Sequence, residues 1–410
     1  MSDAVPPKGT GPLARREARL AWGLLLPTLL IVSAVVVIPL LSIFWISFKP
    51  IGLADLRPPA PVIRESLRGS GEEMRIEYRL RNSSRSETIS GVTLRDTLPE
   101  GLTPGALDPR CAIEGRDLFC DFGDLDGGGR DELELSVTLE GEEAAVEAAL
   151  EASVPAISGT APNVLTSLDF SLENFQRVFD GGEFWSVLGV TMFYTVFGTI
   201  GALLVGLFAA MLLDRSFKGQ SILRGLYLFP YVAPVIAVAF TWVILFDPFS
   251  GSANALLIQM GVSDTSINFF GERPLALIMV TVFEIWRYFP LSFLFILARM
   301  QSIGEDMYEA ADMDGASPFQ QFWFLSLPQL LGILSVLFLL RFIWTFNKFD
   351  DIFLLTGGNA GTRTLTVNVY EQAFAVSNIG AGAAVAVVIF GCLLIFSYFF
   401  FRFISREEGL

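Results

Sequence analysis

Six long apolar runs alternate with polar segments along this chain of 410 residues. A helix needs about 20 apolar residues to cross the hydrocarbon core of a bilayer. The runs therefore predict an α-helical multi-pass membrane protein with six transmembrane helices, at residues 21–47, 185–213, 222–246, 274–298, 329–349 and 382–403. The first run is too long and begins too late for a secretory signal, so we expect it to remain in the mature protein.

The polar segments between the runs set the domain organisation and its orientation. Lys and Arg fall on one side of the alternating topology, which the positive-inside rule makes the cytoplasmic side; they are Lys8, Arg15, Arg16, Arg19, Arg215, Lys218, Arg224, Arg299, Arg402 and Arg406. We expect both termini to be cytoplasmic. The predicted parts are a tail (1–20), a first transmembrane helix (21–48), an extracytoplasmic insert with linkers (49–184), a five-helix core (185–403) with a cytoplasmic loop (299–328), and a tail (404–410).

Composition supports the membrane assignment and excludes several functions. The chain is 52% hydrophobic and contains 37 Phe, which would leave a soluble fold with too much exposed apolar surface. The net charge of −15 is concentrated in residues 51–160, which hold 22 acidic residues and 11 Arg. Nothing here resembles a basic nucleic-acid-binding surface. The chain has no His, which removes the commonest metal ligand and general base, and we expect no metal site or catalytic residue.

The insert has the alternating pattern of β-strands. Ile76, Tyr78 and Leu80 fall on one face of a predicted strand, and a later strand has the same alternation, with Leu133, Leu135, Val137 and Leu139. These segments predict a small antiparallel β-sandwich. The sequence of the insert resembles the repeated Ig-like β-sandwich domains of bacterial surface proteins. The residues that carry this resemblance are Asn82, Asp96-Thr97-Leu98-Pro99-Glu100-Gly101-Leu102, a cysteine pair and Phe122-Gly123-Asp124-Leu125.

Two local features of the insert leave alternatives open. Cys111 and Cys120 are expected on the outer side, where oxidation is permitted, and predict a disulfide; the alternative is two small buried side chains, as expected for Cys392. The segment with Asp124 and Asp126 favours a tight hairpin turn over a calcium loop, because no bidentate Glu follows at the required spacing.

A polar segment, residues 300–331, separates two of the apolar runs. Ser302 and Glu305 have the spacing of a capping box, so a short helix is expected to start there. Small side chains at 310, 311 and 315 would let another protein approach its backbone closely, with Glu309 free to meet a cation. The alternative is an amphipathic linker lying on the membrane surface.

This segment resembles the EAA motif, the coupling loop of binding-protein-dependent ABC importer permeases. The matching residues are Glu309, Ala310, Ala311, Gly315, Leu327 and Pro328. The resemblance implies that the loop docks on an ATPase. Later residues resemble the sugar-type permeases, namely Trp344, Phe346, Asn347, Phe349, Asp350, Leu355, Thr356, Gly357, Gly358, Thr364, Tyr370, Ala373 and Phe374. Asn359 stands where many relatives have Pro.

Ionisable residues within the spans mark candidate functional positions, because a charge in lipid normally faces a cavity or a partner. Glu284 and Arg287 are three apart on one face of the fourth span, and Lys348, Asp350 and Asp351 lie toward the outer end of the fifth. These residues are expected either to line a translocation pathway or to form structural ion pairs that orient the helices. For Asp350 and Asp351, an exposed position at the membrane interface is a third alternative.

Sugars are bound by flat aromatic faces together with amide, carboxylate or Arg groups, and Trp286 supplies one such face. Resemblance to the larger permease subunit of maltose transporters places the sugar-contacting positions on Glu284, Arg287, Tyr288, Leu291, Phe346, Asn347 and Asp350. Several differ in chemistry from that relative, so its substrate is not carried over.

The resemblance implies a permease subunit of an ABC importer for a sugar or oligosaccharide in a bacterial or archaeal plasma membrane. Its expected partners are a second permease, a dimeric ATPase and an extracytoplasmic sugar-binding protein. The chain contains no Walker motif, so ATP and Mg are expected on the ATPase and no cofactor here. The alternatives are an ion-coupled secondary carrier and a membrane sensor, which co-purification and uptake separate.

Overall fold

The computed structural model describes residues 12–69, 74–84, 87–139, 150, 153–180 and 182–407. The expected tail residues 1–11, with Lys8, and residues 408–410 lie outside this range. The chain divides into two compact units. One consists of the residues up to Asn174 with Val376–Gly380, and the other of Phe175–Ala375 with the residues from Ala381 onward.

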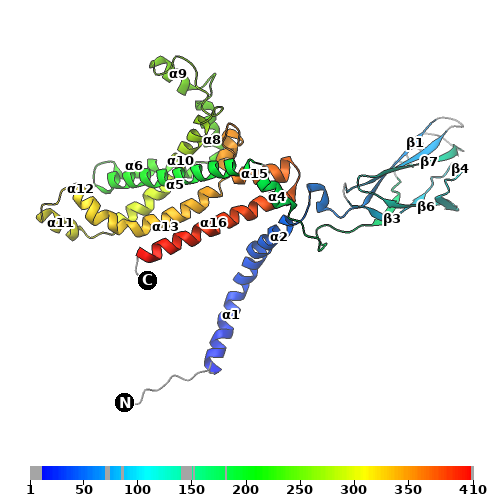
Figure 1. Cartoon of the computed structure of the whole chain (residues 1–410), viewed down its shortest axis with the longest axis horizontal. Coiled ribbons are helices and arrows are strands. Elements are labelled where there is room, and N and C mark those ends of the chain that lie inside the picture. The colour runs from blue at the N-terminus through cyan, green and yellow to red at the C-terminus, as the bar shows by residue number, and fades with distance from the viewer. Residues whose placement is uncertain are drawn as a thin grey trace. The chain divides into compact units, whose positions relative to one another are not determined.

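The first unit begins with a long apolar helix (Figure 1). It consists of α1 (Pro12–Val32), a π-helical turn (Ser33–Val37) and α2 (Ile38–Ser47). Its Arg16–Ser47 part is long and apolar enough to cross a membrane, in agreement with the run expected at 21–47. A 3₁₀ turn (Leu53–Leu56) follows.

Lys49 links the chain segment that precedes the β-strands of this unit to the segment that follows them. Its Nζ donates to Asp169 O at 2.8 Å and to Ser167 Oγ at 3.1 Å, and lies 4.5 Å from the centre of the Phe170 ring. Asn174 adds two bonds, since its Nδ2 donates to the carbonyl groups of Ser47 and Lys49. The stem of the β-domain is therefore closed by buried polar contacts.

In the described part of the chain, eight strands form two antiparallel sheets. Their order is β1-β2-β7-β4 in one sheet and β5-β6-β3-β8 in the other. The strands are β1 (Pro61–Arg68), β2 (Arg75–Asn82), β3 (Ile89–Thr97), β4 (Leu102–Pro104), β5 (Cys111–Glu114), β6 (Asp117–Leu125), β7 (Arg130–Leu139) and β8 (Ala156–Thr160).

One apolar core lies between the two sheets. Ile76, Tyr78 and Leu80 of β2 pack in it with Leu94 of β3 and Leu118 of β6. The alternation expected for β2 and β7 is confirmed, because Leu133, Leu135 and Val137 are also buried here; the side chain of Leu139 lies outside the described part. The unit contains an all-β sandwich. Cys111 and Cys120, opposite each other on β5 and β6, are joined by a disulfide.

The tight hairpin turn expected within residues 123–132 is wrong, because the strands on its two sides do not pair with each other. β6 and β7 belong to different sheets, so the turn between them crosses from one sheet to the other. Asp124 Oδ1 accepts from Gly91 N and Asp126 Oδ1 from Thr88 Oγ1. Because these carboxylates are used in separate places, the turn provides no convergent ligand set for calcium.

The second unit is helical. α5, α10, α13 and α16 run side by side, with α11 and α12 at one end and α15 toward the other (Figure 1). The helices are α4 (Glu173–Asp180), α5 (Phe184–Asp214), α6 (Gln220–Tyr227), α7 (Phe229–Val232), α8 (Val235–Leu245), α9 (Ser252–Gln259), α10 (Leu275–Met300), α11 (Glu305–Met313), α12 (Pro318–Gln321), α13 (Leu327–Phe346), α14 (Asp350–Thr356), α15 (Leu365–Tyr370) and α16 (Ile379–Glu407), with π-helical turns at Phe322–Ser326 and Glu371–Ala375.

Among the described residues, five helices are long and apolar enough to cross a membrane, or six when one bent pair counts as a span. That pair occupies the run expected as one transmembrane helix at 222–246. The segments Gln220–Val232 and Val235–Leu245 meet at 91°. Pro230 and Pro234 explain the break, since a proline ring removes a backbone donor and obstructs the preceding turn.

α5 and α10 approach closely through small residues on α5. Gly198, Ala202 and Gly206 are spaced by four, and Ala202 is fully buried. A Cβ atom added at Gly206 would lie 2.8 Å from Phe293 N and 3.0 Å from Phe289 O. Such a stripe lets two membrane helices pack backbone against backbone, and it brings α5 beside the charges of α10.

Candidate functional site

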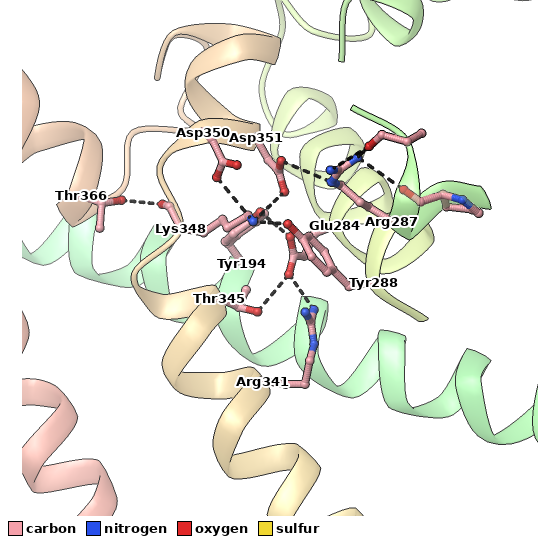
Figure 2. A network of polar contacts seen from close by, with 12 residues as sticks. Tyr194, Glu284, Arg287, Tyr288, Arg341, Thr345, Lys348, Asp350, Asp351 and Thr366 are labelled. Atoms are coloured by element: carbon pink, nitrogen blue, oxygen red, sulfur yellow. Dashed lines mark hydrogen bonds and ion pairs between the residues drawn. The ribbon is translucent and has the colours of Figure 1, made fainter. Parts of the chain in front are cut away.

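Glu284 joins three helices of the bundle (Figure 2). It lies on α10 and is fully buried. Its Oε1 accepts from Arg341 Nη2 at 2.7 Å and from Thr345 Oγ1 at 2.9 Å, both on α13. Its Oε2 accepts from Tyr194 OH of α5 at 3.0 Å. With three donors on one carboxylate, Glu284 is compensated well enough to remain charged in a buried place.

Arg287 does not pair with Glu284, so the structural pair considered from their i,i+3 spacing is wrong. Its guanidinium donates to two backbone carbonyls at the break before α8, Pro230 O at 3.3 Å and Ala233 O at 3.2 Å. Its Nε lies 4.0 Å from Asp351 Oδ1. Carbonyl groups freed at a break in a membrane helix need a new donor, and Arg287 supplies it.

Tyr288 lies among three cationic side chains (Figure 2). The centre of its ring is 4.5 Å from Arg341 Cζ, 4.3 Å from Lys348 Nζ and 5.7 Å from Arg287 Cζ. Lys348 also contacts its hydroxyl. Lys348 Nζ is 3.4 Å from Asp350 Oδ1 and 3.6 Å from Asp351 Oδ2. Cations over an aromatic face are stabilised by the ring quadrupole, so Tyr288 is the apolar centre of the network.

The network has equal numbers of acidic and basic residues and is only partly accessible. It contains three carboxylates and three cations, namely Glu284, Asp350, Asp351, Arg287, Arg341 and Lys348. The Asp350 side chain is 46% exposed, whereas that of Asp351 is fully buried. Neither carboxylate oxygen of Asp351 has a hydrogen-bond partner. An interfacial position therefore fits Asp350 and is wrong for Asp351, which is held by ion pairs alone.

The other expected pathway residues have mixed environments. Trp286 is half-buried and packs against Trp242, with ring centres 5.5 Å apart. Phe346 is buried in an apolar cluster beside Phe342. Leu291 is half-buried, and Asn347 is exposed with its amide bonded to Ile343 O. The structure brings Glu284, Tyr288 and Asp350 into one network. It places Phe346 outside this network, in a buried apolar cluster.

Three members of the network were missed in the sequence. Arg341, Tyr194 and Thr345 all bind Glu284. Arg341 carried a usable signal, because it is a charged residue inside the apolar run 329–349, where charge is costly. Lys348 and Asp350 lie beyond the end of α13 at Phe346 and not within the fifth span.

The polar segment forms an exposed loop with a short helix. The expected short helix is present as α11, with Glu305 and Asp306 in its first turn, but its N-cap is Gly304 and the capping box expected at Ser302 is wrong. Ser302 Oγ donates to Arg299 O, because Ser302 still belongs to the C-terminal turn of α10. A capping box is found at Ser317 and Gln320, before α12.

Hydrogen bonds within the loop stabilise its conformation, and most of its motif residues are exposed on its surface. Tyr308 OH and Ser326 Oγ are 2.8 Å apart, and Gln321 Nε2 donates to Asp312 Oδ1. The motif positions Glu309, Ala310, Gly315 and Pro328 are exposed, and Ala311 is half-buried. Gly315 has a φ of +77°, a conformation that favours glycine. The loop offers a small-residue helix to a partner.

Comparison with known proteins gives a family match over half of the chain. Residues 202–407 match the family described as "Binding-protein-dependent transport system inner membrane component". The inner membrane ABC transporter permease protein YcjO of Escherichia coli (strain K12) is 34% identical over 236 residues, 56% of this chain and 77% of that protein. The trehalose/maltose transport system permease protein MalF of Thermococcus litoralis is 32% identical over 232 residues, 56% of this chain and 78% of that protein.

A solved structure shares the fold. It is a bacterial ABC transporter involved in the import of the acidic polysaccharide alginate, with a TM-score of 0.53 and 19% sequence identity, covering 59% of this chain and 85% of that one. At this identity the likeness concerns the fold alone.

Proposed function

The chain belongs to the family of binding-protein-dependent transport system inner membrane components, and from this premise we propose how its parts divide the work of transport. It is a permease subunit of an ABC importer of the sugar type, and it is not itself an enzyme. The observation that carries this conclusion is the family match over residues 202–407, which includes the exposed loop with α11.

The exposed loop is the proposed ATPase contact. Glu309 and Ala310 are available on its surface, and the internal bonds of Tyr308 and Gln321 keep the loop shaped without a partner. A dimeric ATPase would hold ATP and Mg and move α11 on closing. A second permease would complete the translocation pathway. An extracytoplasmic binding protein would deliver the substrate; the bacterial alginate ABC transporter has been solved in complex with a periplasmic protein that holds an alginate pentasaccharide.

The sugar is proposed to pass the accessible side of the charge network. Tyr288 and Asp350 are only partly covered, and Asn347 is exposed, so a hydroxyl-rich ligand can reach them. Glu284 and Arg287 are buried, and the Glu284 carboxylate and the Arg287 terminal nitrogens are hydrogen-bonded to protein groups. We assign these two to holding the helices and the first three to the pathway, with Trp286 and Leu291 beside it.

The orientation is part of the proposal. The C-terminal ends of α5 and α10 carry Arg215 and Arg299, and such residues face the cytoplasm by the positive-inside rule. Both chain termini then lie in the cytoplasm and the β-sandwich outside. The disulfide between Cys111 and Cys120 is consistent with an oxidising side. We interpret the sandwich as an Ig-like insert in an inner-membrane permease.

The test is affinity purification of the chain from its native membrane. Wild type should recover an ATPase and a second permease, and Glu309→Lys should lose the ATPase because the docking helix then carries the opposite charge. Glu114→Lys, an exposed change on β5, is the matched control. Purification of the wild-type chain alone, still active in uptake, would contradict the importer and support an ion-coupled carrier.

A further inference from the structure

One face of the β-sandwich is rich in arginine although the insert as a whole is acidic. The outward positions of β1, β2 and β7 hold six of the eleven arginines in residues 51–160 and three glutamates, a net charge of +3. The arginines are Arg64, Arg68, Arg75, Arg79, Arg81 and Arg130. All six are exposed. We call this set the arginine face.

The arginines lie directly opposite one another across the sheet. The register pairs Arg64 with Arg79 and Arg68 with Arg75 between β1 and β2. It pairs Arg81 with Arg130 between β2 and β7. Like charges at directly opposed positions destabilise a sheet. Folding alone therefore does not explain this arrangement.

The glutamates neutralise only half of the arginine face. Glu77 lies 3.6 Å from Arg68 and 2.7 Å from Arg79. Glu134 lies 3.5 Å from Arg75. In the described part of the chain, Arg64, Arg81 and Arg130 have no carboxylate within ion-pair distance. Three guanidinium groups are thus open to an anion from outside.

Three carboxylates lie close together on this face, but they contact arginines and are therefore poorly suited to bind a metal ion. Glu77, Glu132 and Glu134 have oxygen atoms within 4.8 Å of one another. Arg79 contacts both Glu77 and Glu132. The carboxylates are therefore already neutralised by guanidinium groups, which oppose binding of a metal ion.

We propose that the arginine face binds an acidic polysaccharide outside the membrane, through the carboxylate groups of its sugar units. This function goes beyond transport and rests on the proposed function only for the extracytoplasmic side. Guanidinium groups match carboxylates in bidentate geometry, and all cationic residues between residues 51 and 160 are arginine.

The shape of the face favours an extended polymer. Outward residues repeat at every second position, about 7 Å apart along a strand. Val62 is the sole large apolar side chain described as exposed on the outward positions of β1, β2 and β7. A protein partner needs a buried apolar or aromatic centre, and a membrane-inserting surface needs aromatic or aliphatic anchors. A chain of repeated carboxylates needs neither.

The test uses the full-length protein in nanodiscs of neutral lipid, with fluorescent polygalacturonate as the probe. Methyl-esterified polygalacturonate has the same backbone without the charges and serves as the ligand control. The variant Arg81→Gln/Arg130→Gln removes one opposed pair. Arg57→Gln/Arg95→Gln removes two exposed arginines elsewhere in the insert. Hydrogen exchange of β2 reports whether each variant remains folded.

Wild type should bind polygalacturonate and not the ester, and binding should weaken on addition of salt. The Arg81/Arg130 variant should bind about tenfold more weakly, as expected for two lost charge-assisted contacts, and the Arg57/Arg95 variant within about twofold of wild type. No binding by wild type, or equal losses in both variants, would overturn the proposal. Binding to phosphatidylglycerol vesicles in place of the polymer would reassign the face to lipid. Uptake by the intact importer is measured separately and tests the proposed function.

Discussion

Glu284 and Arg341 form the central ion pair of the helical bundle. Arg341 Nη2 lies 2.7 Å from Glu284 Oε1, and the side chains are 1% and 2% exposed. The pair joins α10 to α13, and Tyr194 of α5 completes it. A buried pair of this kind is a constraint on helix position, because neither charge is stable there without the other.

Replacing one partner of this pair should be far more damaging than replacing both. Arg341→Met leaves a buried carboxylate uncompensated, which costs about 3–5 kcal/mol. Glu284→Gln with Arg341→Met should recover much of that loss. The measurement is the thermal unfolding midpoint of the purified protein, with exposed Arg402→Met as the control. If the two single effects simply add in the double variant, the residues are not coupled.

Arg287 is expected to be irreplaceable by Lys. Its guanidinium reaches Pro230 O, Ala233 O and the vicinity of Asp351 together, whereas an ammonium group is a compact charge without the planar fork. Arg287→Lys should therefore loosen the break between α7 and α8. Hydrogen exchange should rise in residues 229–245.

Arg224→Lys is the matched control for that change. Arg224 Nη2 donates to a single carbonyl, that of Leu213, which Lys can also satisfy. We expect its exchange pattern to match wild type. Unchanged exchange in Arg287→Lys would show that the broken span is held by its helices alone.

The local pattern of apolar residues was enough to predict the long helices. It was not enough to predict contacts between side chains on different helices. Among the described residues, apolar runs located the five helices that are long and apolar enough to cross a membrane, and also the bent pair, because crossing a bilayer sets the length of such a run. The partner of Glu284 was misassigned because Arg287 is three positions away, whereas Arg341 is 57 positions away on another helix. Spacing identifies neighbours on one helix, and choosing between helices requires the packing.

Other errors in the sequence interpretation have local causes. The bend before α8 was foreseeable from Pro230 and Pro234, which are four apart in an apolar run. The absence of a capping box at Ser302 was not foreseeable, because the role of Ser302 depends on where α10 ends. The turn after β6 matched a hairpin in composition, but only the sheet topology shows that its strands belong to different sheets.

The contact between α5 and α10 should depend on Gly206. An added Cβ would meet backbone atoms of α10 within 3.0 Å, and overpacking of this kind typically costs about 1–3 kcal/mol. Gly206→Ala should lower the unfolding midpoint and the yield of assembled importer. Gly189→Ala on the same helix is the control, since nothing lies within 4 Å of its Cβ position. Equal midpoints for the two variants would contradict close packing at Gly206.

The β-sandwich should be less stable above neutral pH because of Glu65. Tyr78 OH donates to Asp96 Oδ2 at 2.6 Å, and both Glu65 carboxyl oxygens are buried without a hydrogen-bond partner. Burial, followed by the charge of Asp96, raises the pKa of Glu65 from 4.5 to about 7. The folded domain therefore binds an extra proton between these values. The stabilisation is complete below pH 4.5 and is lost as the pH rises through about 7.

Hydrogen exchange of β1, β2 and β3 in the full-length protein measures this effect, after correction for the intrinsic pH dependence of exchange. Protection should be greater at about pH 5 than at about pH 8 in wild type. Glu65→Gln should remove most of the difference, because a neutral amide imposes no charge beside Asp96 at either pH. Burial raises the pKa of Tyr78, so its hydroxyl remains protonated and continues to donate throughout. The same loss of protection in Glu65→Gln would assign the effect to a group other than Glu65.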